Sequence, residues 1–252
     1  MKKLKFNILV VMIFLSGISN LSAQKFEGEI TYERTYYWVK VNNRLPFLSD
    51  EEKDRMKYTY GSKDGWSTKM KLSVANNQTV YTYLDQGASE SGDWTWRQDE
   101  FIIFRDLTTM HRKEMIETLG KSYLIDEPLH FPKWKILNEI KDVAGYLCMK
   151  AETIDTIKNQ KIVAWFSDQI PVNGGPELLA GLPGMILELD INQGCVVITA
   201  LSVTEKKLEN GLPLPKKWKG KKISDFDLQK ATKKHIDESI KNKRNPFWGL
   251  RY

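Results

Sequence analysis

The 252-residue chain has little cysteine, with two residues, and only ordinary amounts of proline (9) and glycine (16). Two cysteines are too few for a small disulfide-stapled scaffold, and this glycine and proline content excludes a collagen-like repeat or a low-complexity disordered chain. No apolar run approaches the roughly 20 residues that a membrane-spanning helix needs, and the mean hydropathy is −0.44. The composition therefore indicates a globular domain.

Recognisable catalytic and metal-binding motifs are also lacking. The three histidines (His111, His130 and His235) lie far apart, and the chain has no H-x-x-x-H pair, no C-x-x-C and no glycine-rich phosphate loop. We therefore predict no cofactor and no metal. One alternative stays open, a hydrolase site assembled in space from Asp168, with His130 or His111 and an acid such as Asp126.

The first residues have the organisation of a secretory signal peptide. Three lysines within the first five residues precede a short apolar run at 8–15, and the small residue Ala23 marks the expected cleavage point. We predict a signal peptide at 1–23 and a single exported domain at 24–252, without a transmembrane span. Nucleic acid is not an expected partner of an exported protein.

Basic residues are concentrated near the C-terminal end of the sequence. Residues 216–252 contain twelve lysines and arginines against four acids, a net charge of +8, whereas the whole chain carries +6. Such a segment could bind anionic lipid. The interspersed acids favour a solvated helical face.

Alternation of apolar and polar residues predicts a mainly β protein. Ser49 with Glu52 resembles a capping box that opens a short helix at 49–58, and Ser224 predicts a C-terminal helix that runs to about 241. Short connections favour a curved antiparallel meander sheet or open barrel. The predicted strands are 26–38, 66–74, 78–84, 94–97, 100–105, 108–114, 133–140, 144–154, 161–167, 185–191 and 195–204.

Aromatic residues and the two cysteines each allow two interpretations. Most aromatics are expected to pair across strands, but Trp94 and Trp96 have polar neighbours and are candidates for a ligand-facing surface. Cys148 and Cys195 could form a disulfide in an oxidising compartment or stay as two buried thiols, and the residue pattern around Cys148 suggests that it points away from the core.

One hexapeptide has a distinctive turn chemistry. Pro183 followed by Gly184 favours a type II turn between Leu182 and Met185. The turn is either a structural device or a loop that binds a ligand or partner. The residues concerned are Gly181, Leu182, Pro183, Gly184, Met185 and Ile186.

This hexapeptide resembles the one that names the GLPGLI family of exported Bacteroidota proteins, with Met185 in place of leucine. Ala144-Gly145-Tyr146 and Trp165-Phe166 are also similar to the pattern of that family. The resemblance implies an exported protein and brings no established reaction.

We therefore expect a non-catalytic binding or accessory protein of the periplasm or outer membrane, with an outer-membrane protein or an amphipathic ligand as partner. A secreted hydrolase is the alternative. A deep apolar cavity would support a ligand carrier, whereas a sheet face filled with side chains would leave only an interaction role.

Overall fold

The computed structural model describes residues 26–61, 65–84 and 100–252. The signal peptide predicted at 1–23 and the strand predicted at 94–97, with Trp94 and Trp96, lie outside these residues. Within them the protein is mostly β, with one large sheet, three α-helices and a short 3₁₀-helix.

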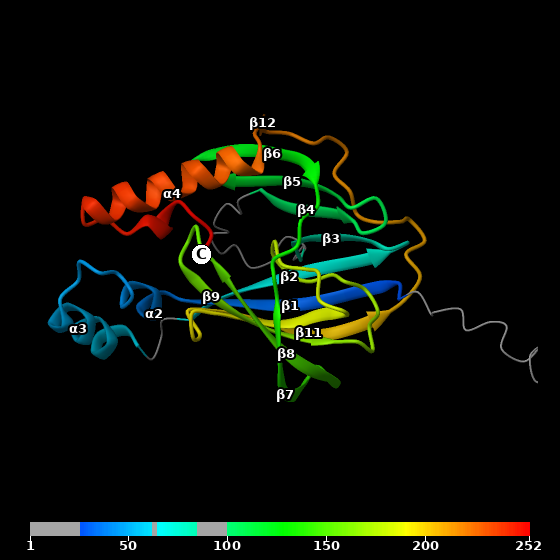
Figure 1. Cartoon of the computed structure of the whole chain (residues 1–252), viewed down its shortest axis with the longest axis horizontal. Coiled ribbons are helices and arrows are strands. Elements are labelled where there is room, and N and C mark those ends of the chain that lie inside the picture. The colour runs from blue at the N-terminus through cyan, green and yellow to red at the C-terminus, as the bar shows by residue number, and fades with distance from the viewer. Residues whose placement is uncertain (1–25, 62–64, 85–99) are drawn as a thin grey trace, which may run out of the picture.

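The strands and helices follow one another as Figure 1 shows. The helices are α2 (Trp38–Asn42), α3 (Asp50–Tyr60), α4 (Asp225–Lys241) and the 3₁₀-helix η1 (Pro246–Trp248). The strands are β1 (Gly28–Tyr37), β2 (Gly65–Ala75), β3 (Gln78–Tyr83), β4 (Phe101–Asp106), β5 (His111–Thr118), β6 (Lys121–Pro128), β7 (Lys135–Val143), β8 (Tyr146–Asp155), β9 (Gln160–Ser167), β10 (Met185–Ile191), β11 (Val196–Glu205) and β12 (Lys221–Lys222).

All twelve strands belong to one open sheet, in the order β12-β6-β5-β4-β3-β2-β1-β11-β10-β9-β8-β7. Two antiparallel meanders, β1 to β6 and β7 to β11, join where β1 pairs with β11. Among the strands that the structure describes, only the short β12 is parallel to its neighbour. The predicted curved antiparallel meander is therefore confirmed, and the curl of the sheet is visible in Figure 1.

The alternation that predicted the strands sets which side chains face the interior. Along β1, Ile30, Tyr32 and Arg34 are buried, whereas the residues between them are half-buried on the other face. The β2–β3 hairpin turns at Asn76 and Asn77, both at positive φ, as a tight hairpin turn of this type requires. The inner face is thus apolar on most strands and carries a few large polar side chains.

Capping chemistry predicted two helices correctly. Ser49 and Glu52 form the reciprocal capping box of α3, with hydrogen bonds of 2.8 and 3.2 Å. Ser224 caps α4 by accepting from Asp227 N, and α4 ends at Lys241. Lys233 and Lys234 of α4 form ion pairs with the acidic residues four positions later, Asp237 and Glu238, which fits the solvated face predicted for this segment.

Some elements differ from the sequence prediction. The strand predicted at 108–114 begins only at His111, because the Asp106 carboxylate accepts hydrogen bonds from Thr108 N and Thr109 N and holds a turn there. β6, β12, α2 and η1 were not predicted.

The described residues contain no helix that is long and apolar enough to cross a membrane.

The two cysteines are free and buried, so the disulfide considered for Cys148 and Cys195 is not formed. Cys148 lies in β8 and Cys195 beside β11, and β9 and β10 separate these strands. Three strand spacings amount to about 14 Å, twice the Cα separation of about 7 Å that a disulfide tolerates. The suggestion that Cys148 points away from the core is wrong, since its side chain is fully buried.

We expect both cysteines to react with a maleimide after denaturation without reductant, giving a mass increase of two adducts. In the folded protein the reaction should be slow, because both thiols are buried and burial raises the pKa of Cys148 to about 11. A denatured, unreduced protein that takes up no maleimide would contradict this thiol assignment.

Candidate functional site

The loop between β9 and β10, residues 168–184 and here called the motif loop, contains most of the distinctive hexapeptide. Two of its glycines are required by geometry. Gly181 has a φ of +93°, and a Cβ there would lie 2.3 Å from Cγ of Phe131. Gly184 has a φ of +145°, and a Cβ there would lie 2.2 Å from the Ser167 carbonyl oxygen. The motif therefore lets the loop pack closely against neighbouring segments.

The turn in the hexapeptide is tighter than the predicted type II turn. Gly184 N donates to Leu182 O at 2.8 Å, across Pro183. Met185 N instead donates to Ile170 O at 3.1 Å, so the hydrogen bond that closes a type II turn is absent from this turn. Leu182 is buried in the core. The hexapeptide thus anchors the loop, and its side chains offer little exposed surface.

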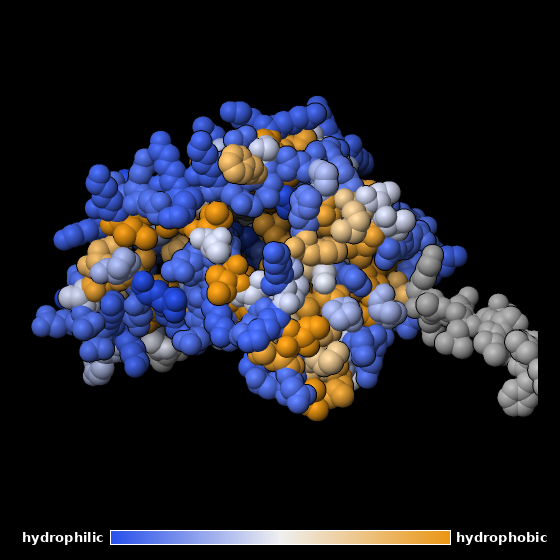
Figure 2. Space-filling view, in the orientation of Figure 1, coloured by the Kyte–Doolittle hydropathy of each residue, from blue (hydrophilic) through white to orange (hydrophobic). Residues whose placement is uncertain are grey.

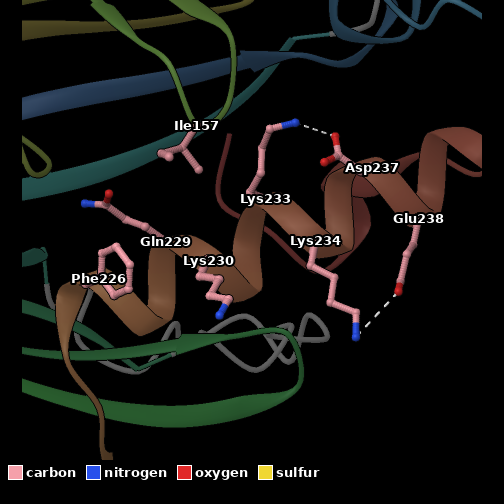
Figure 3. Close-up of a pocket in the computed structure, with 8 residues that line it drawn as sticks. All are labelled: Ile157, Phe226, Gln229, Lys230, Lys233, Lys234, Asp237 and Glu238. Carbon is pink, nitrogen blue, oxygen red and sulfur yellow. Dashed lines mark hydrogen bonds and ion pairs between the residues drawn. The ribbon is translucent and has the colours of Figure 1, made fainter.

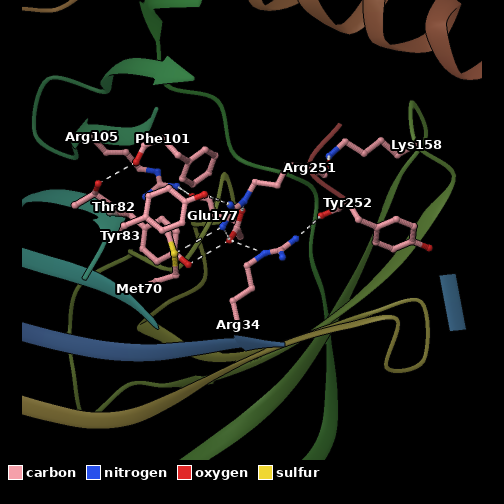
Figure 4. Close-up of polar contacts among 11 residues, drawn as sticks. Arg34, Met70, Thr82, Tyr83, Phe101, Arg105, Lys158, Glu177, Arg251 and Tyr252 are labelled. Carbon is pink, nitrogen blue, oxygen red and sulfur yellow. Dashed lines mark hydrogen bonds and ion pairs between the residues drawn. The ribbon is translucent and has the colours of Figure 1, made fainter. Parts of the chain in front are cut away.

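The anchored loop carries Glu177 into the interior of the curled sheet (Figure 4). Glu177 has a φ of +55°, which is uncommon for a residue other than glycine. Its side chain is only 12% exposed, and its carboxylate accepts a hydrogen bond of 3.2 Å from the Tyr81 hydroxyl of β3. A buried carboxylate in unfavourable backbone geometry requires strong partners.

Two arginines supply the opposite charge. Arg251 binds Glu177 through two hydrogen bonds of 2.6 Å each, from Nε to Oε2 and from Nη2 to Oε1. Arg34 of β1 lies 3.4 Å from Oε1 as an ion pair. The Arg251 guanidinium also stacks over the ring of Phe101, 3.9 Å from its centroid, and donates to the Tyr83 hydroxyl at 3.2 Å. The loop, the sheet and the C-terminal segment therefore meet at one carboxylate.

Further cations bind backbone oxygens around this carboxylate. Arg105 of β4 donates to the carbonyl oxygens of Gly175 and Glu177, the first at 3.2 Å. Lys158 donates to Arg251 O at 2.7 Å. We call Glu177, Arg34, Arg105, Lys158 and Arg251 the Glu177 cluster.

The charges of the cluster perturb one another. Burial alone would raise the pKa of Glu177, but the positive charge and hydrogen bonds of Arg251, with the charge of Arg34, outweigh it and lower the pKa to about 2. Burial and the neighbouring charge of Arg251 lower the pKa of Arg34 to about 10. Glu177 is therefore ionised at neutral pH and acts as the counter-charge of the interior.

The structure brings together one of the predicted hydrolase pairs. His111 and Asp126 face each other across β5 and β6 with 2.7 Å between Nε2 and Oδ1, but their side chains are 42% and 36% exposed, and Lys113 also pairs with Asp126. His130 and Asp168 are exposed and take no part in this pair. Among the described residues no group of three or more histidines, cysteines and acids could hold a metal.

Surface grooves occur at two places in the described part of the chain. One, of about 480 Å³, runs between α4 and Ile157 and is lined mainly by Phe226 and side chains of α4, including Lys230 and Lys234 (Figure 3). The other, of about 450 Å³, lies beside Tyr83, Met115 and the loop at Leu214. Neither groove includes His111.

An exposed apolar surface lies at the free end of the sheet. The register places Ile136 opposite Ala151 and Ile140 opposite Met149, so these side chains point to the same face as the core residues of β9. Ile136, Ile140 and Leu147 are nonetheless 51%, 65% and 54% exposed. We call Ile136, Ile140, Leu147 and Met149 the edge patch. Figure 2 shows hydrophobic side chains gathered at the lower end of the molecule, where Figure 1 places β7 and β8.

Sequence reasoning missed both the Glu177 cluster and the edge patch. A charged residue within an apolar motif segment was a signal for Glu177, but nothing in the pattern linked it to Arg251, 74 residues later. The edge patch was missed because its alternation is that of an ordinary half-buried strand, and the sequence does not show that β7 is the last strand of the sheet and that its apolar side chains are exposed.

Comparisons with known proteins add a family model and a fold. A family described as "Protein of unknown function (Porph_ging)" matches residues 152–188, which run from β8 through the motif loop into β10. The comparison with curated proteins gave no match.

Two solved structures are similar to this chain, both of PNGF-II, in C2 and P21 space groups. The TM-scores are 0.54 and 0.53 at 14% and 15% identity, and each match covers 81% of this chain and 32% of the other. The chain thus spans about a third of the length of these proteins. At such identity the likeness shows a shared fold alone.

We expect Glu177→Gln to lower the free energy of unfolding at pH 7 by about 3–5 kcal/mol, since it leaves two buried arginines without their counter-charge. The pKa of Glu177 is lowered from 4.5 to about 2, so its stabilisation is fully present above pH 4.5 and is lost as the pH falls through 2. Urea unfolding measured from pH 7 to pH 2 should therefore show a smaller fall in the free energy of unfolding for the variant than for the wild-type protein.

The matched control is Glu139→Gln. Glu139 pairs with Lys150 at 2.8 Å, but its side chain is 55% exposed, so the expected loss is below about 1 kcal/mol. Equal losses for the two variants would contradict the role assigned to Glu177.

Proposed function

We propose that this protein is an exported, non-catalytic binding or accessory protein of the cell envelope that acts by contacting a protein partner. The observation that carries the proposal is the edge patch, where three large apolar side chains are more than half exposed at the free end of the sheet. Contiguous exposed apolar side chains at a sheet end are typical of interaction surfaces.

The filled interior argues against a carrier for an amphipathic ligand. Along β1, β2, β3 and β9 the inner face of the sheet is filled by side chains that are fully buried, namely Tyr32, Met70, Tyr81 and Phe166. The Glu177 cluster packs against two of them, Tyr81 and Met70. A protein partner is therefore the better candidate. An outer-membrane protein suits an exported chain.

Export is proposed from the sequence. The basic start, short apolar run and small residue before position 24 support a cleaved signal peptide, and the hexapeptide at 181–186 resembles that of the exported GLPGLI family. A cleaved signal peptide supports a location in the periplasm or at the outer membrane.

A secreted hydrolase is the second candidate, supported by the His111–Asp126 contact of 2.7 Å. We rank it lower because the pair is exposed, shares its carboxylate with Lys113 and lies outside both grooves. A general base acts on a bound substrate, which needs a cleft beside it.

Cross-linking in the native envelope, followed by mass spectrometry, tests the edge patch. We expect the wild-type protein to form a discrete cross-linked product and the double variant Ile136→Ser, Ile140→Ser to lose most of it, since both residues point from β7 to the same face. The variant should fold normally, because both side chains are already exposed.

Ile154→Ser is the matched control. Ile154 is 66% exposed, but its position in β8 directs it to the opposite face from Leu147 and Met149. Loss of the product in both variants, or in neither, would overturn the proposal.

A further inference from the structure

The segment Asn245–Tyr252 enters the inner side of the sheet without becoming a strand of it. Beyond η1 its residues have no regular secondary structure. Gly249 O accepts from Leu119 N at 2.8 Å, Arg251 O accepts from the Lys158 side chain, and Tyr252 O accepts from Arg34 Nη2 at 3.3 Å. The backbone of this segment is thus held largely by side chains of other elements.

Arg251 occupies a site that fits an arginine in every respect. Glu177 binds the guanidinium through two parallel hydrogen bonds, and the Phe101 ring covers its face at 3.9 Å. The Tyr83 hydroxyl accepts a third hydrogen bond, from Nη1 of Arg251. A paired carboxylate with an aromatic face selects arginine over lysine, because only the planar guanidinium makes both contacts at once.

Tyr252 occupies a neighbouring site that fits an aromatic residue. Its hydroxyl accepts from Asn192 Nδ2 at 2.7 Å. Its ring packs edge-on against Phe247 at 4.6 Å and Tyr36 at 6.3 Å between centroids. Tyr252 is only 6% exposed.

Most of the groups that form these two sites belong to elements that are complete without the segment. Arg34 lies in β1, Tyr83 in β3 and Phe101 in β4, all paired on both sides by neighbouring strands. Glu177 is held by the motif loop, whose glycines fix its course. The receptor side is therefore formed by the fold itself, and the segment adds no strand to the sheet.

The segment is also open to solvent at its middle. Trp248 is 90% exposed and Gly249 is exposed. Pro246, Leu250 and Tyr252 are buried, and the Arg251 side chain is 21% exposed. Within the part of the chain that the structure describes, the segment is held by side-chain contacts and by one backbone hydrogen bond, from Leu119 N to Gly249 O.

We propose that the inner face of the sheet is a receptor for an arginine–aromatic segment of a partner polypeptide, and that residues 245–252 occupy this receptor in cis. The proposal is independent of the edge patch. The contacts of Arg251 with Glu177, Phe101 and Tyr83 are equally available to an arginine of another chain. Those of Tyr252 with Asn192 and Tyr36 are likewise available to another aromatic residue, whereas Phe247 belongs to the segment itself. A tethered segment competes at an effective concentration on the order of millimolar. A partner therefore gains access when its own local concentration is comparably high, as it would be for two proteins held in one envelope complex.

Fluorescence polarisation with a labelled peptide of the sequence of residues 245–252 tests this with the full-length protein. We expect Arg251→Ala, which weakens the cis occupant, to bind the peptide at least tenfold more tightly than the wild-type protein does. Glu177→Gln added to Arg251→Ala should abolish binding, as should a peptide in which alanine replaces the arginine. Arg244→Ala, at an exposed arginine just before the segment, is the matched control and should behave as wild type.

Hydrogen exchange of the wild-type protein keeps the proposal testable if Arg251→Ala does not fold. Excess unlabelled peptide should increase exchange at the amides of Leu250 to Tyr252 and leave the amides of β10 unchanged. Absence of peptide binding to any folded form at millimolar concentration, or binding that does not depend on Glu177, would overturn the proposal. A concentration-dependent dimer that exchanges this segment between copies would also overturn it in favour of self-association.

Discussion

The Glu177 carboxylate, through its bidentate contact with Arg251 and its ion pair with Arg34, holds together three parts of the molecule that are distant in sequence. Glu177 comes from the motif loop, Arg34 from the first strand of the sheet, and Arg251 from the C-terminal segment. Each of these groups would be costly to bury alone, because an unpaired charge in the interior loses its hydration without compensation. The motif loop, anchored by its glycines, therefore presents Glu177 to both arginines, and the C-terminal segment takes its position from this contact.

The open sheet explains why such a cluster is needed. Twelve strands in one sheet curl but do not close, and the order leaves β12 and β7 at the two ends. The connection from β6 to β7 crosses from one meander to the other, and on its way Trp134 donates to Ala180 O at 3.0 Å and Phe131 packs against Gly181. The crossing segment, the motif loop and the C-terminal segment together fill the open side. The glycines at 181 and 184 have their role here, since a side chain at either position would push the loop away from its neighbours.

Local patterns predicted the fold well where the chemistry is local. Alternation along β1 and asparagines at positive φ in the β2–β3 turn are short-range signals, and Ser49 with Glu52 marked its helix correctly. β6 has three consecutive buried apolar residues, Tyr123, Leu124 and Ile125, and so lacks the alternation that marks a half-buried strand. Whether the two cysteines form a disulfide could not be decided without the strand order. The Glu177 cluster could not be predicted either, because Glu177 is 74 residues from Arg251 and 96 residues from Tyr81 in the sequence. Side chains that are brought together only by the order of the strands produce no periodic pattern in the sequence.

A double-mutant cycle between Glu177 and Arg251 tests most directly whether their contact organises the interior. Urea unfolding of Glu177→Gln, Arg251→Gln and the double variant gives the coupling free energy of the pair, free of the separate effects of each substitution. We predict a coupling of about 2–3 kcal/mol at pH 7, near the upper end for contacting residues. Additive losses, with a coupling within about 0.5 kcal/mol of zero, would show that the loop and the C-terminal segment are held independently and would contradict the central role of this contact.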